Sequence, residues 1–164
     1  MRDGFKTILL FVDYKTHAKY KVDLRSKTEN GTAFSTIVSL FGIHKLDYHC
    51  RIYTDGCGSM VHVEGAAEKC GVDHAYIPPH QQSLNEAEKV ADQSFASTRA
   101  LILHSKAPDK LFAKALDYVL YTDCWTSTTG SREWKTPYEM VRGTQPSIAK
   151  LHRFCTQCFV AVPK

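Results

Sequence analysis

The first part of the chain contains two short stretches with different hydrophobic patterns. Lys6 to Asp13 is a nearly continuous apolar run that ends in an acid, which is typical of a central strand covered on both faces. Lys19 to Leu24 alternates polar and apolar positions, as a half-exposed antiparallel strand does. Because only a short polar turn separates the two stretches, the pattern predicts a β-hairpin.

Helical and strand-like patterns then alternate. Apolar residues recur at helical spacing from Ala33 to Phe41, and a second helix is expected at Val63 to Cys70, with Gly71 as its C-cap. Short strands are expected at Cys50 to Thr54 and His74 to Ile77. This alternation predicts an α/β fold in which helices flank one mixed sheet.

The longest predicted helix begins after Ser83 and runs to about Lys106. Ser83-Leu84-Asn85-Glu86 fits a capping box, in which Glu86 reaches back to the backbone N–H of Ser83. The residues expected on its buried stripe are Ala87, Ala91, Phe95, Thr98 and Ile102.

Shorter elements are expected in the C-terminal part. A helix should follow Pro108 and bury Leu111, Ala115, Val119 and Leu120. After a polar loop at residues 127–135, a helical turn is expected at residues 137–140, ending near Gly143, and a last short strand at residues 158–162.

The composition is that of an ordinary globular protein. With 43% hydrophobic and 23% charged residues, the 164 residues are enough for one well-buried core. The longest apolar run, Ile8 to Val12, is far too short to cross a bilayer, so no membrane association is expected. A net charge of +4 and a pI near 8.7 permit a polyanionic partner without requiring one.

Two other kinds of chemistry find little support. Six cysteines without a secretion signal indicate free thiols in a reducing compartment. Cys155 and Cys158 have the spacing of half a zinc site, but no second ligand pair follows. The segment Gly58-Ser59-Met60 lacks the second glycine that a serine hydrolase needs at its nucleophile.

Asp55 and Glu88 are the carboxylates whose positions suggest chemistry. Two-metal phosphoryl transfer needs acids at the ends of neighbouring elements, where the cations can share oxygen ligands. Asp55 follows a predicted strand, and Glu88 lies in the first turns of the longest helix, where the helix dipole favours an ionised carboxylate. Glu86 is the competitor of Glu88, but the capping box already gives it a structural role. Two solvated surface acids are the alternative interpretation, and spacing alone does not exclude it.

Five motifs in a fixed order carry a resemblance to a known family. They are FVDYKTHAKYKVDLRSK from Phe11, TDGCGS from Thr54, PPHQQSLNEAEK from Pro78, TPYEMVRGTQPS from Thr136 and LHRFCTQCFVAVPK from Leu151. Over nearly the whole chain the sequence resembles the catalytic core of copia-type retrotransposon integrases, in the RNase H-like retroviral integrase superfamily. The sequence departs from the family pattern in three places: Gly56 replaces an asparagine, Ser59 and Met60 occupy the region of a usual acid, and Lys89 replaces an arginine.

This resemblance implies an RNase H-like mixed sheet and an Asp, Asp, Glu triad that binds Mg²⁺ or Mn²⁺. Asp55 matches the second acid and Glu88 the third. Asp13 is a candidate for the first acid because it ends a strand ahead of Asp55. In the family, however, the motif resembling FVDYKT belongs to the second strand, and the first metal-binding aspartate lies on the strand before it. The resemblance therefore favours a core that lacks its first strand and its first acid.

The function implied by the resemblance is DNA integration, by 3′-end processing and strand transfer of retroelement DNA. Residues 1–126 would be the catalytic core and residues 127–164 a C-terminal extension of it. DNA would be the partner, with Lys89, Arg99 and Gln82 as candidate contacts and basic hairpin residues such as Lys19 and Lys21 as further ones. The active protein is expected to be a homo-oligomer in the nucleus or in a cytoplasmic virus-like particle. The alternative is an inactive integrase remnant that binds nucleic acid without chemistry.

Overall fold

The computed structural model describes residues 6–41, 50–78, 85–126 and 134–156, and it divides the chain into two compact units. The first unit comprises Met1–Phe11 and Tyr20–Ala91, and the second comprises Val12–Lys19 and Asp92–Lys164. The predicted last strand at residues 158–162 lies outside the described residues, as does most of the predicted loop at residues 127–135. No helix among the described residues has both the length and the apolar character needed to cross a membrane.

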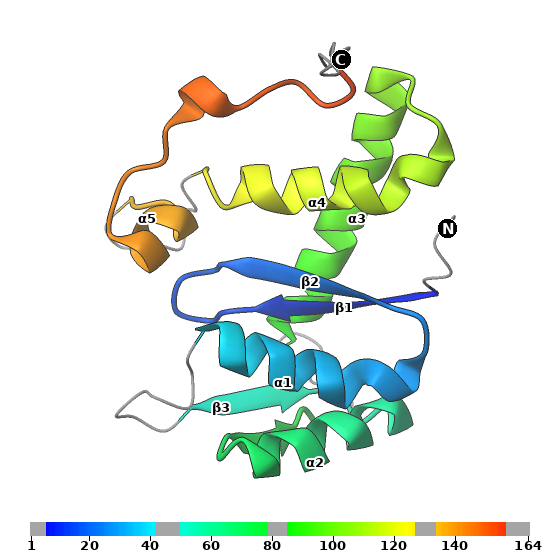
Figure 1. The fold of residues 1–164 in the computed structure, drawn as a ribbon, viewed down its shortest axis with the longest axis vertical. Helices are drawn as coiled ribbons and strands as arrows, with labels where there is room; N and C mark the ends of the chain where they lie inside the picture. Colours follow the sequence, from blue (N-terminus) through cyan, green and yellow to red (C-terminus); the bar gives the residue numbers. More distant parts are fainter. Residues whose placement is uncertain (1–5, 42–49, 79–84, 127–133, 157–164) are drawn as a thin grey trace, which may run out of the picture. The chain divides into compact units, whose positions relative to one another are not determined.

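The predicted hairpin is confirmed. Strand β1 (Thr7–Val12) pairs with β2 (Lys19–Leu24), as Figure 1 shows. Just outside the strands, the N–H of Lys6 donates to the carbonyl of Leu24 at 2.8 Å, and the N–H of Asp13 donates to the carbonyl of Ala18 at 2.9 Å. Because the earlier residue of the first strand pairs with the later residue of the second, the two strands are antiparallel.

A second pair of strands forms a separate sheet. Strand β3 (Arg51–Thr54) runs parallel to β4 (Asp73–Tyr76), in a register that pairs Arg51 with Asp73 and Thr54 with Tyr76. The α/β class is therefore confirmed, but the described strands form two two-stranded sheets where one mixed sheet was expected. The physical reason is that no strand within residues 6–41, 50–78, 85–126 and 134–156 lies between the two pairs to join them.

Two helices cover the strands of the first unit. Helix α1 (Asn30–Phe41) follows the 3-10 turn Lys27–Glu29, and α2 (Val61–Lys69) lies beside it (Figure 1). Their facing side chains form one apolar cluster, against which Phe11 of β1 and Ile52 of β3 also pack. The buried members of this cluster are Phe34, Val38, Val63, Ala66, Ala67 and Val72. Both sheets thus share one core, as the burial of apolar surface requires of so small a unit.

Glycine permits the close approach of α1 and α2. A Cβ atom at Gly31 would lie 2.4 Å from the backbone oxygen of His62, well inside any normal contact. At the other end of α2, Gly71 has φ +67, which confirms it as the C-terminal stop expected from the sequence.

Helix α3 (Glu86–Ser105) buries a different stripe from the predicted one. Thr98 and Ile102 are buried as expected, but Ala87, Ala91 and Phe95 are only half-buried. Val90 and Ser94 are buried instead, and the Thr98 hydroxyl donates to the Ser94 carbonyl at 2.6 Å. Because Ser94 is small and polar, a pattern of apolar positions places this part of the stripe at Ala91 and Phe95, one residue later than the buried Val90 and Ser94.

The second unit is organised around helix α4 (Phe112–Asp123), which follows the 3-10 turn Asp109–Leu111. Its buried residues are Ala115, Leu116, Val119 and Leu120. The following helix α5 (Pro137–Arg142) begins at Thr136, whose hydroxyl accepts from the N–H of Glu139 at 3.1 Å, and it ends at Gly143 with φ +70. The predicted turn and its glycine stop are therefore confirmed.

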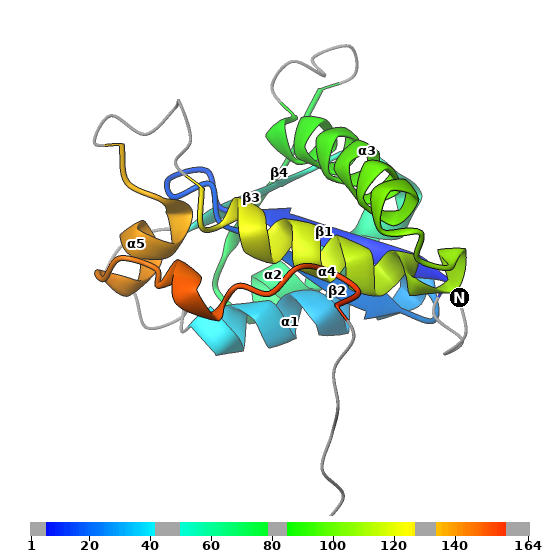
Figure 2. The same ribbon diagram turned by 90° about the horizontal axis from the view of Figure 1, so that it is seen from above.

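The segment after α5 returns along α4, as Figure 2 shows. The Tyr118 hydroxyl donates to the carbonyl of His152 at 2.8 Å, and the rings of Tyr118 and Phe154 lie 5.5 Å apart. Residues 134–156 thus belong to the same compact unit as α4. The division into a core at residues 1–126 and an extension at residues 127–164 stays a prediction.

Candidate functional site

Asp55 is the first residue after β3. The strand's last residue, Thr54, is only 9% exposed and is held at two points. Its carbonyl accepts from the N–H of Ile77 at 2.8 Å, and its hydroxyl bonds to Nε2 of His74 at 2.8 Å. Asp55 itself is exposed, and its carboxylate has no hydrogen-bond or ion-pair partner among the described residues. A firmly held strand end therefore presents a free carboxylate to solvent.

The start of α3 differs from the predicted capping box. The helix begins at Glu86, and the side-chain oxygen of Asn85 accepts from the N–H of Glu88 at 3.2 Å. Asn85 is therefore the N-cap, while Ser83 lies outside the described residues. Sequence alone could not choose between them, because asparagine and serine are about equally good caps. Glu86 is the first helical residue, and its predicted contact with Ser83 falls outside the described residues.

This cap places Glu88 in the first turn of α3, at its third residue. Its carboxylate is exposed and has no partner among the described parts of the chain. The positive end of the helix dipole stabilises a negative charge there. A glutamate at this position can also reach back to the N–H of the cap residue, so Glu88 suits a structural role as well as a metal-binding one.

Replacing Asn85 with alanine should lower the free energy of unfolding by about 1 kcal/mol, because the N–H of Glu88 would lose its acceptor. Urea denaturation measures this loss. Asn85→Asp is the matched control, since aspartate caps equally well, and it should stay near wild type. An Asn85→Ala variant as stable as Asn85→Asp would mean that this side chain does not cap α3.

Asp13 has a structural role in the hairpin turn. One of its carboxylate oxygens accepts from both the N–H and the hydroxyl of Thr16, and its carbonyl accepts from the N–H of His17 at 2.7 Å. This is the usual use of aspartate in tight turns. The carboxylate is thus already engaged, unlike those of Asp55 and Glu88. Its assignment as the first metal-binding acid stays a prediction, and not the favoured one.

Thr54, which precedes Asp55, is the first of four residues linked by side-chain contacts. The sequence analysis did not predict these contacts. His74, which bonds to Thr54, has its ring edge-on to Tyr76, with ring centroids 4.6 Å apart. The Tyr76 hydroxyl donates to Glu64 of α2 at 2.8 Å, and this hydrogen bond raises the pKa of Tyr76. The strand register is the signal that could have predicted these contacts, because in parallel β3 and β4 these side chains meet at the same end of the sheet.

The candidate DNA-contact residues differ in exposure and in ion pairing. Lys89 and Arg99 are both exposed on α3, so their predicted role stays open, whereas Gln82 lies outside the described residues. Lys19 is ion-paired with Asp123 at 2.8 Å, and Lys21 with Asp23 at 2.7 Å. These two lysines are largely buried, so the structure does not support their inclusion among the basic DNA contacts.

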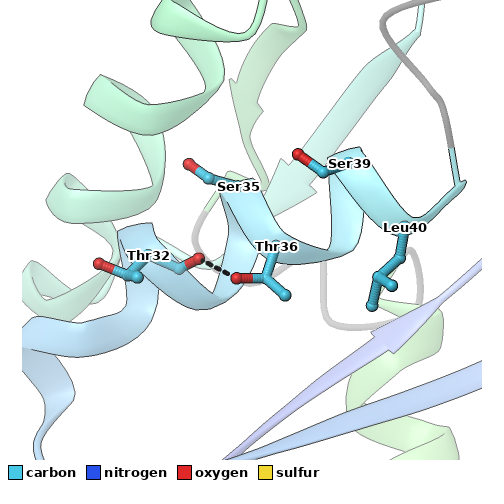
Figure 3. Close-up of a pocket in the computed structure, with 5 residues that line it drawn as sticks. All are labelled: Thr32, Ser35, Thr36, Ser39 and Leu40. Carbon is cyan, nitrogen blue, oxygen red and sulfur yellow. Dashed lines mark hydrogen bonds between the residues drawn. The ribbon is translucent and has the colours of Figure 1, made fainter.

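A shallow hollow along α1 contains neither predicted acid. It is lined by Thr32, Ser35, Thr36, Ser39 and Leu40 (Figure 3). The Thr36 hydroxyl donates to the carbonyl of Thr32 at 2.9 Å, and that of Ser35 donates to the carbonyl of Gly31 at 3.1 Å. Because these hydroxyls are used within the helix, the hollow offers few groups for catalysis.

The described residues contain no cluster of three or more histidine, cysteine, aspartate or glutamate side chains that could hold a metal. Asp55 and Glu88 are hard oxygen donors of the kind that Mg²⁺ prefers, so they fit part of such a site. Five cysteines within the described ranges form no disulfide, namely Cys50, Cys57, Cys70, Cys124 and Cys155.

Comparison with solved structures relates this fold to a viral assembly. One similar chain occurs in the cryo-electron microscopy structure of the simian T-cell lymphotropic virus intasome in complex with the PP2A regulatory subunit B56 gamma. The TM-score is 0.62 at 17% sequence identity, and the match covers 96% of this chain and 54% of the other. The fold is similar to that of a retroviral intasome chain. At this identity the likeness extends to the fold alone, and the present chain spans about half of the matched chain's length. No protein-family model and no curated protein sequence matches it.

Proposed function

We propose that the chain is the catalytic-core region of a copia-type retrotransposon integrase with an RNase H-like fold. It would take part in Mg²⁺-dependent 3′-end processing and strand transfer of retroelement DNA. The observation that carries this proposal is the likeness to an intasome chain over 96% of the residues. The ordered integrase-like motifs of the sequence also support it.

Asp55 and Glu88 would hold the metal, Mg²⁺ or Mn²⁺. When bound, the metal would activate water or a DNA 3′-hydroxyl for in-line attack on a phosphodiester. The chain's own contribution is placement: Thr54 holds the backbone before Asp55, and Asn85 fixes the first turn that bears Glu88. Exposed Lys89 and Arg99 would contact DNA phosphates, and the active form would be a homo-oligomer in the nucleus or in a cytoplasmic virus-like particle.

We further propose that a strand from outside the described residues completes the sheet and carries the first acid. A parallel pair of four-residue strands such as β3 and β4 is unusual by itself, because parallel sheets are normally larger and covered on both faces. In β1, the edge opposite β2 has no strand partner among the described residues, although Leu9 in that strand is buried. Buried backbone groups need hydrogen-bond partners, which an additional strand between the two sheets would supply.

Calorimetric titration of the full chain with Mn²⁺ tests the metal site. Asp55→Asn and Glu88→Gln should each weaken binding at least roughly tenfold, because each removes a charged oxygen ligand. Asp13→Asn should leave the affinity unchanged, since that carboxylate serves the hairpin turn. Glu68→Gln, at another exposed glutamate on α2, is the matched control and should also have no effect.

Two results would change the assignment. If Asp13→Asn weakens binding as much as Asp55→Asn does, Asp13 supplies the first acid and no further strand is needed for it. If the wild-type chain does not bind Mn²⁺, or if Glu68→Gln weakens binding equally, Asp55 and Glu88 are ordinary surface acids.

The second candidate function is a catalytically inactive integrase remnant that still binds nucleic acid. It is favoured by one observation: the carboxylate of Asp13 is engaged in a turn and not free for a metal. Such a remnant would bind duplex DNA with an affinity that falls as salt rises, without any dependence on Mn²⁺. A strand-transfer assay on oligonucleotides distinguishes the two, because only the enzyme joins DNA ends.

A further inference from the structure

Two hydrogen bonds hold the last residue of β3, Thr54, in place. Thr54 is bonded through its carbonyl to Ile77 and through its hydroxyl to His74, each at 2.8 Å. The hydroxyl lies on a residue that is only 9% exposed, so removing its partner would leave a buried polar group unsatisfied. Such a loss is unfavourable and should loosen the last residue of the strand.

His74 is itself held in place from α2. Its ring lies edge-on to Tyr76, at an interplanar angle of 87°. The Tyr76 hydroxyl is bonded to Glu64, which belongs to α2. The imidazole therefore contacts both Thr54 at the end of β3 and Tyr76, which is bonded to α2.

Asp55 depends on this link because its carboxylate has no hydrogen bond or ion pair of its own among the described residues. The direction in which its carboxylate leaves β3 is set by the backbone of Thr54. A metal ligand must be held within a few tenths of an ångström of its working position. Residues behind a ligand therefore affect affinity even when they do not touch the metal.

We infer that His74 is a positioning residue that fixes the Asp55 carboxylate through the hydroxyl of Thr54. The inference rests on the proposed function, since it assigns a partner to a proposed metal ligand. The sequence places His74 only at the start of a short expected strand and gives it no functional role.

A double-mutant cycle on the full chain tests the inference. His74→Ala and Thr54→Val each remove one side of the same hydrogen bond, so each should weaken Mn²⁺ binding roughly fivefold. This is less than the roughly 10- to 100-fold loss on replacing a residue bonded directly to a ligand. The double variant should bind no more weakly than either single one, because the bond can be lost only once. His74→Gln, which keeps a polar group near the position of Nε2, should restore most of the affinity.

The Arg51–Asp73 pair provides the control. It joins the same two strands at the other end of the sheet, with a side-chain contact of 3.5 Å between exposed groups. Arg51→Ala should leave Mn²⁺ affinity unchanged. Titrations are made well below the melting temperature of every variant, so that a general loss of stability does not reduce the folded fraction.

Hydrogen exchange at the Ile77 amide separates failure of this inference from failure of the proposed function, because this amide donates to Thr54. Faster exchange in His74→Ala and Thr54→Val, together with weaker Mn²⁺ binding, is the expected result. Faster exchange with unchanged affinity would overturn the positioning role and leave the metal site intact. Affinities that fall additively in the double variant would also overturn it. If the wild type binds no Mn²⁺, the proposed function itself fails, and with it the role of Asp55 that His74 would serve.

Discussion

Replacing Gly31 with alanine should destabilise the protein by about 2 kcal/mol. The new Cβ would lie 2.4 Å from the backbone oxygen of His62, and a backbone atom cannot move aside as a flexible side chain can. Helices α1 and α2 would have to separate, which typically costs about 1–3 kcal/mol in a packed core. Alanine would gain at most about 1 kcal/mol of helix propensity over glycine, so the clash should prevail.

Gly65 provides the matched control, because it lies in α2 and a Cβ there would meet nothing within 4 Å. Gly65→Ala should therefore stabilise the protein by about 0.5–1 kcal/mol. Urea denaturation of both variants gives the two changes with opposite signs. A Gly31→Ala variant as stable as Gly65→Ala would show that α1 and α2 do not pack this closely.

Replacing Leu116 with alanine should destabilise the second unit by about 2–5 kcal/mol. Leu116 lies in α4, is 1% exposed and has the largest side chain of the fully buried residues in the part of the chain that the structure describes. The substitution removes buried methyl groups and leaves a cavity, and both effects act against folding. The loss is measured as a shift of the denaturation midpoint, followed by circular dichroism.

Leu103 is the control that separates the effect of burial from the effect of a leucine-to-alanine substitution as such. The same substitution at this residue, which is 78% exposed on α3, should change stability by less than about 0.5 kcal/mol. Equal losses at Leu116 and Leu103 would contradict the packing of α4 described above.

Local signals in the sequence predicted much of the fold. The hairpin followed from the contrast between a continuous and an alternating hydrophobic stretch, and β2 occupies the residues expected for it. The ends of α2 and α5 followed from Gly71 and Gly143, since both adopt the left-handed conformation that favours glycine. These features depend on neighbours in the sequence, which is why pattern analysis finds them.

Features that depend on distant residues or on a choice between similar residues were missed. Asn85 caps α3 in place of Ser83, although both residue types cap well. The buried stripe of α3 includes Ser94, whose small polar side chain does not count as apolar. The separation of the two sheets depends on which strands pair, and hydrophobic patterns do not determine that.

The candidate site was predictable in position but not in detail. Asp55 does follow a strand and Glu88 does lie at the start of a helix, as the sequence indicated. The contrast between the free carboxylate of Asp55 and the engaged one of Asp13 required hydrogen bonds that only the structure provides. Their roles as metal ligands stay predictions until binding is measured.

The unpaired strand edges affect how the oligomeric state of the isolated chain should be interpreted. Among the described residues, β1 and β3 each have a strand partner on one side only, and a row of free N–H and C=O groups is a template for pairing with another molecule. A dimer that forms on concentrating the chain can therefore be edge-to-edge pairing and not the proposed functional assembly. Backbone amide protection in β1 and β3 distinguishes the two forms, because only edge pairing increases it.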